Sequence, residues 1–262
     1  MRMVSRRTGS ERATKLLITA AAAVGLAVTI LVGVALWNSA GPAADSYESS
    51  YIPPATAEAK EPMFTLPPDP RVLFLGDSLT DGTAASNKKE LGFAPRLAKI
   101  EGWTDYAVDG VGLSGFLSPG ISEEAHRNYR DRLQQIFFTN TYSPNVIIFQ
   151  AGANDKEYRS SDIRKKVVET IAVARKYWPN VQILLMGPIT SSTNLSATNA
   201  AYRSAAYESE IFYIDAMRTP IIPPDERKEL ISDDGWHAND AGHQRIAEEL
   251  HSRISEISMR SN

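Results

Sequence analysis

The sequence predicts an α/β protein, a three-layer sandwich with a parallel sheet, preceded by an N-terminal membrane-spanning helix. After Arg71, short apolar runs alternate with longer amphipathic stretches, which is typical of strand–helix repeats. Parallel strands need helices on both faces, so this alternation indicates three layers. Near the N-terminus, a basic segment precedes a long uncharged run. Together these patterns predict an N-terminal membrane anchor followed by one exported, full-sized folded domain.

The anchor is predicted from residues 1–37. Five cations occupy the segment 1–15, namely Arg2, Arg6, Arg7, Arg12 and Lys15. The next 22 residues, 16–37, carry no charge, and as a helix they would rise roughly 33 Å, enough to cross a hydrocarbon core of about 30 Å. Because basic flanks stay in the cytoplasm, we expect a single-pass cell-membrane protein with an extracytoplasmic domain.

A cleaved secretory signal is the alternative interpretation of the same segment. Secretory signals have a shorter apolar region, followed by an Ala-x-Ala-like site. Asn38-Ser39-Ala40 is a poor version of that site, so an uncleaved anchor is favoured over secretion. Residues 38–70 are rich in Ala, Ser, Glu and Pro without apolar periodicity, which predicts a tether, and 71–262 form the expected domain.

Five strands and five main helices are expected in alternation within that domain. The strands are Val72–Leu75, Thr104–Val108, Val146–Gln150, Val181–Met186 and Ile211–Ile214. The helices are Phe93–Ile100, Asn128–Phe138, Asp162–Tyr177, Ala197–Glu208 and Asp240–Ser258. We expect the strands to form a flavodoxin-like sheet.

Composition excludes several kinds of chemistry. The chain has no cysteine, so thiolate nucleophiles, disulfides and cysteine zinc sites are ruled out. The net charge is only −3, and no Lys/Arg cluster after residue 15 suggests a nucleic-acid surface, so no nucleic-acid partner is expected. Metal, nucleotide and nicotinamide motifs are absent from the sequence, so we expect no metal and no cofactor.

His126, His243 and His251 lie in polar stretches and are expected to face solvent.

Three polar segments lie where ligand sites gather in open α/β sheets, beyond the carboxyl ends of the strands. The first is Gly76-Asp77-Ser78-Leu79-Thr80-Asp81-Gly82, after the first strand. The second is Gly152-Ala153-Asn154-Asp155, after the third strand, and the last is Asp234-Gly235-Trp236-His237, before the final helix.

These segments contain the parts of a serine-based acyl-transfer site. Gly76 permits a tight turn before Ser78, and a helix beginning there would supply N–H donors. A serine hydroxyl needs a base, and His237 is suited because an imidazole changes protonation near neutral pH. Asp234 would fix its tautomer and stabilise the imidazolium. The oxyanion needs donors, available from the Ser78 amide, a glycine amide and the Asn154 side chain.

Each segment taken alone also fits a purely structural role. Asp77 or Ser78 suits an N-cap at a strand–helix turn. Asn154 equally suits a cap of the next helix, and Asp234 with His237 suits a surface turn before the last helix. Their occurrence together, in this order and at these strand ends, favours catalysis.

In order along the chain, these segments resemble the sequence blocks of the GDSL lipase/esterase family, also called the SGNH hydrolases. The resemblance covers roughly residues 70–258. It implies Ser78 as the nucleophile, with Asp234 and His237 as its supporting pair. It also implies an oxyanion hole made by the Ser78 amide, a glycine amide and the Asn154 side chain.

The glycine donor is expected in the segment 108–115, which resembles the family's second block. Gly115 is favoured, with Gly112 as the fallback. Two positions depart from the family pattern. Asp109 stands where the second block often has Asn, and Ala238 follows the histidine where Pro is usual. The first departure leaves the choice of glycine open, whereas the second should affect only the loop into the last helix.

The resemblance implies a serine hydrolase that cleaves carboxylic esters through an acyl-enzyme on Ser78. Its expected partner is an ester-containing small molecule or an acylated glycan, with envelope polysaccharide as the natural target suggested by export. An acyltransferase that moves the acyl group onto an envelope sugar is the closest alternative. A non-catalytic glycan-binding module is a third, although none of the three proposed catalytic residues is missing. Phe116, Trp236 and Ile221-Ile222 are candidates for an apolar substrate wall.

Overall fold

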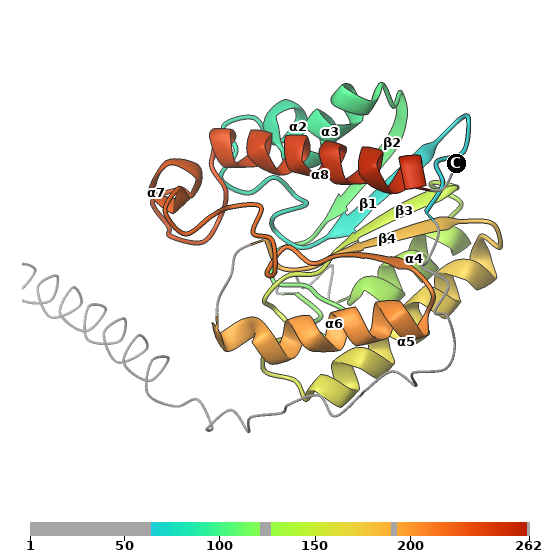
Figure 1. Cartoon of the computed structure of the whole chain (residues 1–262). Coiled ribbons are helices and arrows are strands. Elements are labelled where there is room, and N and C mark those ends of the chain that lie inside the picture. The colour runs from blue at the N-terminus through green and yellow to red at the C-terminus, as the bar shows by residue number, and fades with distance from the viewer. Residues whose placement is uncertain (1–63, 121–126, 190–192, 261–262) are drawn as a thin grey trace, which may run out of the picture. The chain divides into compact units, whose positions relative to one another are not determined.

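The computed structural model describes residues 64–120, 127–189 and 193–260, built on a five-stranded parallel sheet (Figure 1). The strands are β1 (Arg71–Gly76), β2 (Asp105–Gly110), β3 (Val146–Gln150), β4 (Gln182–Met186) and β5 (Phe212–Ile214). Their order across the sheet is β2-β1-β3-β4-β5, and every neighbouring pair is parallel. This is the flavodoxin-like order, so the predicted sheet is confirmed.

Helices cover both faces of the sheet, which confirms the predicted three layers (Figure 1). On one face lie α3 (Phe93–Glu101) and α8 (Asp240–Arg260), and on the other lie α4 (Tyr129–Phe138), α5 (Ser160–Tyr177) and α6 (Ser196–Glu208). Three short elements complete the fold, namely α2 (Lys88–Leu91), the 3-10 turn η1 (Thr193–Leu195) and α7 (Arg227–Leu230).

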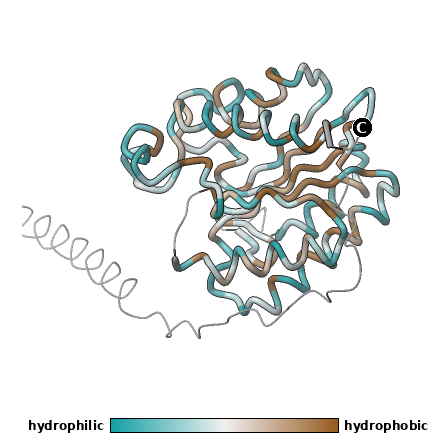
Figure 2. The backbone as a smooth tube through the Cα atoms, viewed as in Figure 1, coloured by the Kyte–Doolittle hydropathy of each residue, from teal (hydrophilic) through white to brown (hydrophobic). Residues whose placement is uncertain are grey.

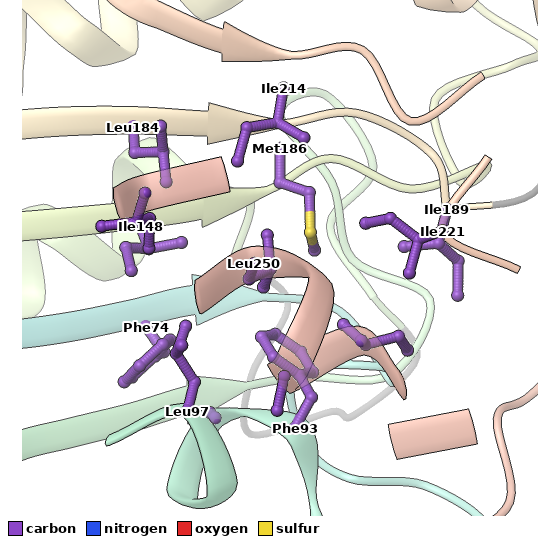
Figure 3. Close-up of a cluster of buried hydrophobic side chains, with 14 of the residues drawn as sticks. Phe74, Phe93, Leu97, Ile148, Leu184, Met186, Ile189, Ile214, Ile221 and Leu250 are labelled. Carbon is purple, nitrogen blue, oxygen red and sulfur yellow. The ribbon is translucent and has the colours of Figure 1, made fainter. Parts of the chain in front are cut away.

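Alternating strand side chains divide the core into two clusters. Phe74 and Ile148 point to the α3/α8 face, whereas Leu73 and Ile147 point to the α4–α6 face. Side chains of successive strand residues point to opposite faces, so a parallel strand buried on both sides is apolar throughout. Figure 3 shows the first cluster, and Figure 2 shows the hydrophobic strands between helices that are polar outside.

The folded domain begins earlier than predicted. Phe64 lies within the predicted tether 38–70, yet its side chain is only 1% exposed and packs in the α3/α8 cluster. The backbone N–H of Thr65 donates to Gln182 Oε1, and Asn145 Nδ2 donates to the carbonyl of Asp69. The predicted boundary at residue 70 is therefore too late. The sequence around Phe64 has two nearby prolines and no apolar periodicity, so it does not indicate that this side chain is buried.

The predicted membrane segment, residues 16–37, and the basic segment before it lie outside the described residues. Within the described ranges, none of the helices combines the length and the apolarity that crossing a bilayer requires. The unit from Pro53 to Asn262 is compact in itself. Its described part contains all the predicted site residues.

Candidate active site

Ser78 lies directly beyond the carboxyl end of β1, in a turn rather than at the start of a helix. The Asp81 amide donates to the Asp77 carbonyl at 3.0 Å, and the Thr83 amide donates to the Ser78 carbonyl at 2.9 Å. Gly82 then takes a φ of +79°, which ends any regular helix. The predicted helical amino end at Ser78 is therefore wrong, since the first helix after β1 is the short α2.

Three predicted residues meet at this turn, although Ser78 and His237 are 159 positions apart in the chain. Ser78 Oγ lies 2.9 Å from His237 Nε2, and His237 Nδ1 lies 2.6 Å from Asp234 Oδ2. When Nδ1–H donates to Asp234, the lone pair of Nε2 faces the Ser78 hydroxyl. This is the arrangement in which a histidine can remove a serine proton.

Asp234 organises the turn that carries His237. Its Oδ1 accepts hydrogen bonds from the amides of Trp236 at 2.8 Å and His237 at 2.9 Å, and from the Ser232 hydroxyl at 2.8 Å. Desolvation opposes ionisation of this carboxyl, but hydrogen bonds from His237, Trp236 and Ser232 outweigh it and hold the pKa of Asp234 well below its ordinary range. The carboxylate therefore stays charged beside the imidazole.

The three candidate oxyanion donors differ in how they are engaged. Among the described residues, the Ser78 amide has no protein acceptor. Asn154 Nδ2 donates to Asp77 Oδ2 at 3.1 Å and to the Ser114 carbonyl at 2.9 Å. The Gly115 amide donates to the Ser118 carbonyl at 2.8 Å. Gly115 would have to exchange that bond for one to substrate, so its assignment stays a prediction.

Gly112, the fallback donor, differs from Gly115. A Cβ at Gly112 would meet nothing within 4 Å, and within the described ranges its amide has no protein acceptor. A Cβ at Gly115 would lie 2.4 Å from Asp155 Oδ1. Gly115 is thus required by packing against Asp155, a structural reason for a glycine that the sequence alone does not reveal.

Asn154 does not cap the following helix. That helix, α5, begins at Ser160, and Arg159 is its N-cap residue. Among the described residues, both hydrogen bonds of the Asn154 side chain are donated by its nitrogen, whereas an N-cap side chain accepts a hydrogen bond. The capping alternative for Asn154 is therefore excluded.

Two charged groups behind the turn were missed by sequence reasoning. Asp77 was considered only as a cap, yet its side chain is buried and its Oδ1 accepts the Leu79 amide at 2.9 Å. Arg132 is also buried, and it donates to the Gly76 carbonyl at 2.7 Å and to Asp109 Oδ1 at 3.0 Å. Asp109, the residue that departs from the family pattern, is therefore an ion-pair partner of Arg132.

Asp155 fixes the loop that carries Gly115. Its fully buried carboxylate accepts the amides of Phe116 at 2.8 Å, Leu117 at 3.1 Å and Ser118 at 2.9 Å. The Tyr202 hydroxyl adds a further donor at 3.1 Å. Backbone N–H groups that converge on one carboxylate hold the loop in a single shape.

The predicted apolar wall is mostly core. Phe116, Ile221 and Ile222 are at most 1% exposed and pack in the two core clusters. Trp236 is 70% exposed, although it stands between Asp234 and His237 in the sequence. Of the proposed wall residues, only Trp236 therefore offers a ring to a ligand.

The expectation that the remaining histidines face solvent is wrong for His243. Its ring is fully buried, its Nδ1 accepts the Phe93 amide at 3.2 Å, and its Nε2 lies 3.2 Å from the Thr83 carbonyl. His251 is half-buried and lies 2.9 Å from Glu101, whereas His126 is outside the described residues. Over the described ranges, no group of three or more acidic or histidine side chains could hold a metal ion.

The domain matches a known protein family. The GDSL-like lipase/acylhydrolase family matches residues 74–245. A GDSL lipase of Mycobacterium tuberculosis is 25% identical over 246 residues, covering 88% of this chain and 94% of that protein.

Solved structures show the same fold at low sequence identity. A family two carbohydrate esterase from Clostridium thermocellum in complex with cellohexaose has a TM-score of 0.56, with 17% identity over 71% of this chain and 63% of that chain. A carbohydrate acetylesterase from Sinorhizobium meliloti, Est24, has a TM-score of 0.54 with 14% identity over 71% of this chain and 98% of that chain. From the family match, which spans most of the domain, the chain belongs to the GDSL-like lipase/acylhydrolase family.

Proposed function

We propose that this GDSL-type esterase removes acyl groups from a polysaccharide outside the cytoplasm, through an acyl-enzyme on Ser78. The observation that carries the proposal is the hydrogen-bonded series from Ser78 Oγ to His237 Nε2 at 2.9 Å and from His237 Nδ1 to Asp234 Oδ2 at 2.6 Å. Such a series activates a hydroxyl that is otherwise a weak nucleophile.

Acylation begins when Ser78 Oγ attacks the ester carbonyl and its proton moves to His237 Nε2. The carbonyl oxygen becomes an oxyanion that accepts hydrogen bonds from the Ser78 amide and the Asn154 side chain. The tetrahedral intermediate then collapses, the bond to the alcohol oxygen breaks, and that oxygen takes the proton from His237. The alcohol leaves, and the acyl group stays on Ser78.

Deacylation reverses these roles with water as the nucleophile. His237 Nε2 takes a proton from water, the resulting hydroxide attacks the acyl carbonyl, and Ser78 Oγ recovers the proton as the acid leaves. Asp234 stays ionised throughout, because its pKa lies well below its ordinary range, and it stabilises the imidazolium in both steps.

A sugar ester as substrate is supported by the surroundings of the site. The exposed ring of Trp236 lies next to His237 in the sequence, where it can stack on a sugar ring without changing the hydrogen bonds of Asp234 and His237. Structural neighbours include carbohydrate esterases, one of them in complex with cellohexaose.

The proposed location follows from the sequence before the domain. We propose that residues 16–37 remain as a membrane anchor, with the domain on the extracytoplasmic side and acylated envelope polysaccharide within its reach. Cleavage of the same segment would release the domain and leave its chemistry unchanged.

The test supplies three substrates to the full-length protein, namely an acetylated xylo-oligosaccharide, p-nitrophenyl acetate and a long-chain p-nitrophenyl ester. Each reaction is run with and without an unacetylated oligosaccharide acceptor, and products are identified by mass spectrometry. We expect free acetate from the sugar ester, weak cleavage of the long-chain ester, and no turnover by Ser78→Ala. Acetyl groups found on the acceptor would establish transfer instead, and turnover by folded Ser78→Ala would contradict the mechanism.

A further inference from the structure

We propose that Asp77 is a positioning residue that sets the geometry of the oxyanion hole, a role that rests on the proposed function. Its two carboxylate oxygens bind two different parts of the site. Oδ1 accepts the Leu79 amide at 2.9 Å, and Oδ2 accepts Asn154 Nδ2 at 3.1 Å. One side chain therefore joins the turn that carries the Ser78 amide to the side chain of Asn154.

The bond to Leu79 shapes the nucleophile turn. A side-chain oxygen that accepts the amide two residues later forms an Asx-turn, which fixes the backbone between the two residues. The residue between Asp77 and Leu79 is Ser78, so this bond orients the peptide whose N–H is a candidate oxyanion donor.

The bond to Asn154 fixes the second donor. The amide nitrogen of Asn154 has two protons, and its two acceptors are Asp77 Oδ2 and the Ser114 carbonyl. A charged acceptor binds more strongly than a neutral carbonyl. We therefore expect a substrate oxyanion to share or replace the bond to Ser114, while Asp77 keeps the amide in place.

The surroundings of Asp77 are built to admit its carboxylate. A Cβ at Gly152 would lie 1.9 Å from Asp77 Oδ2, so only glycine leaves room for this oxygen. The Asp77 amide donates to Gln150 Oε1 at 3.1 Å, and Thr80 Oγ1 donates to the same oxygen at 3.1 Å. The main chain and the side chain of Asp77 are thus both fixed.

The charge of Asp77 is retained at an energetic disadvantage. Burial raises the pKa of Asp77 to about 6, against weaker opposing effects of Leu79, Gln150, His237 and Arg132. Perturbed carboxylates of this kind concentrate at functional sites. Asparagine would fit the same space, but it has a single acceptor oxygen and can serve only one of the two donors. The structure thus gives a reason for a carboxylate at this position.

The test is a double-mutant cycle on kcat with the full-length protein and p-nitrophenyl acetate. We expect Asp77→Asn to lower kcat by about tenfold or more, with KM changed by less than about twofold, because oxyanion bonds strengthen in the transition state. The single asparagine oxygen can keep the Leu79 amide, so Asp77→Asn loses the bond to Asn154. In the Asn154→Ala background the same substitution should therefore have less than about a twofold effect on kcat. Asp81→Asn is the matched control in the same turn, since Asp81 contacts Lys88 and Thr83 instead.

A second variant approaches the same contact from the other side. Gly152→Ala should displace the Asp77 carboxylate and lower kcat in the same direction as Asp77→Asn. All rates are compared at temperatures where thermal unfolding shows each variant to be folded. The positioning role would be overturned if Asp77→Asn lowered kcat by the same factor in the wild-type and the Asn154→Ala backgrounds. It would also be overturned if Asp77→Asn kept the wild-type kcat. Turnover by Ser78→Ala would instead overturn the proposed function itself.

Discussion

Replacing Asp77 by Asn should change how the stability of the domain depends on pH. The pKa of the Asp77 carboxyl is raised from 3.8 to about 6 in the folded protein, because burial disfavours its charged form. This difference between the folded and the unfolded pKa corresponds to about 3 kcal/mol. Because the folded pKa is above the unfolded one, the neutral carboxyl makes a favourable contribution to folding that is fully present below pH 3.8. This contribution is lost as the pH rises through about 6.

Asparagine cannot titrate, so Asp77→Asn removes this pH dependence while losing one of two hydrogen bonds. Below the folded pKa the wild-type side chain is itself neutral and its second oxygen is a weaker acceptor, so the lost bond costs at most about 1 kcal/mol there. We therefore expect the variant to be at most slightly less stable than wild type at pH 4. At pH 8, where the wild-type carboxylate is buried and charged, the variant should be more stable by roughly 1 to 2 kcal/mol.

The assay is denaturant unfolding of the full-length protein in mild detergent, followed by tryptophan fluorescence at pH 4, 6 and 8. Only the change of this stability difference with pH is decisive, because the titration of Asp77 is its source. A difference between variant and wild type that stays constant from pH 4 to pH 8 would refute the buried, titrating carboxylate.

Three further predictions address the ligand, a second buried group and the anchor. Trp236→Ala should raise KM for an acetylated xylo-oligosaccharide by roughly fivefold, about 1 kcal/mol of lost stacking, and leave p-nitrophenyl acetate kinetics within about twofold; equal effects on both substrates would argue against stacking. Burial lowers the pKa of His243, so its contribution to stability is present above pH 6.5 and is lost as the pH falls through the folded pKa. His243→Gln should therefore flatten the fall in unfolding temperature between pH 7 and pH 5, and an unchanged slope would contradict this. Full-length protein should fractionate with membranes and lose its domain when protease is added to spheroplasts, whereas a soluble form beginning near Gly41 would establish signal cleavage.

The sequence predicts the sheet well because parallel strands have a simple signature. Val146–Gln150 is buried at every position, and its predicted bounds agree with β3. The edge strand β2 is mostly exposed or half-buried, so its predicted start and end are less accurate. The four-residue helices α2 and α7 were missed, because a single turn is too short to display a helical period.

The site was predictable where chemistry and position coincide. Ser78 and His237 were proposed because each residue type suits its role and lies beyond a strand or before a helix, and the structure brings their side chains to 2.9 Å of each other. The contacts of Asp77 with Gln150 and Asn154 join residues more than 70 positions apart, so no local pattern indicates them. The engagement of the Gly115 amide by Ser118 likewise depends on a loop shape that Asp155 determines.

In the proposed mechanism, Ser78 is a nucleophile activated by His237. The most direct measurement is intact mass spectrometry after brief exposure to a fluorophosphonate, with the adduct mapped by peptide sequencing. We expect one adduct per chain on Ser78, none in Ser78→Ala, and strongly slowed labelling in His237→Ala. An unlabelled wild-type protein, or an adduct on another residue that persists in Ser78→Ala, would contradict the account.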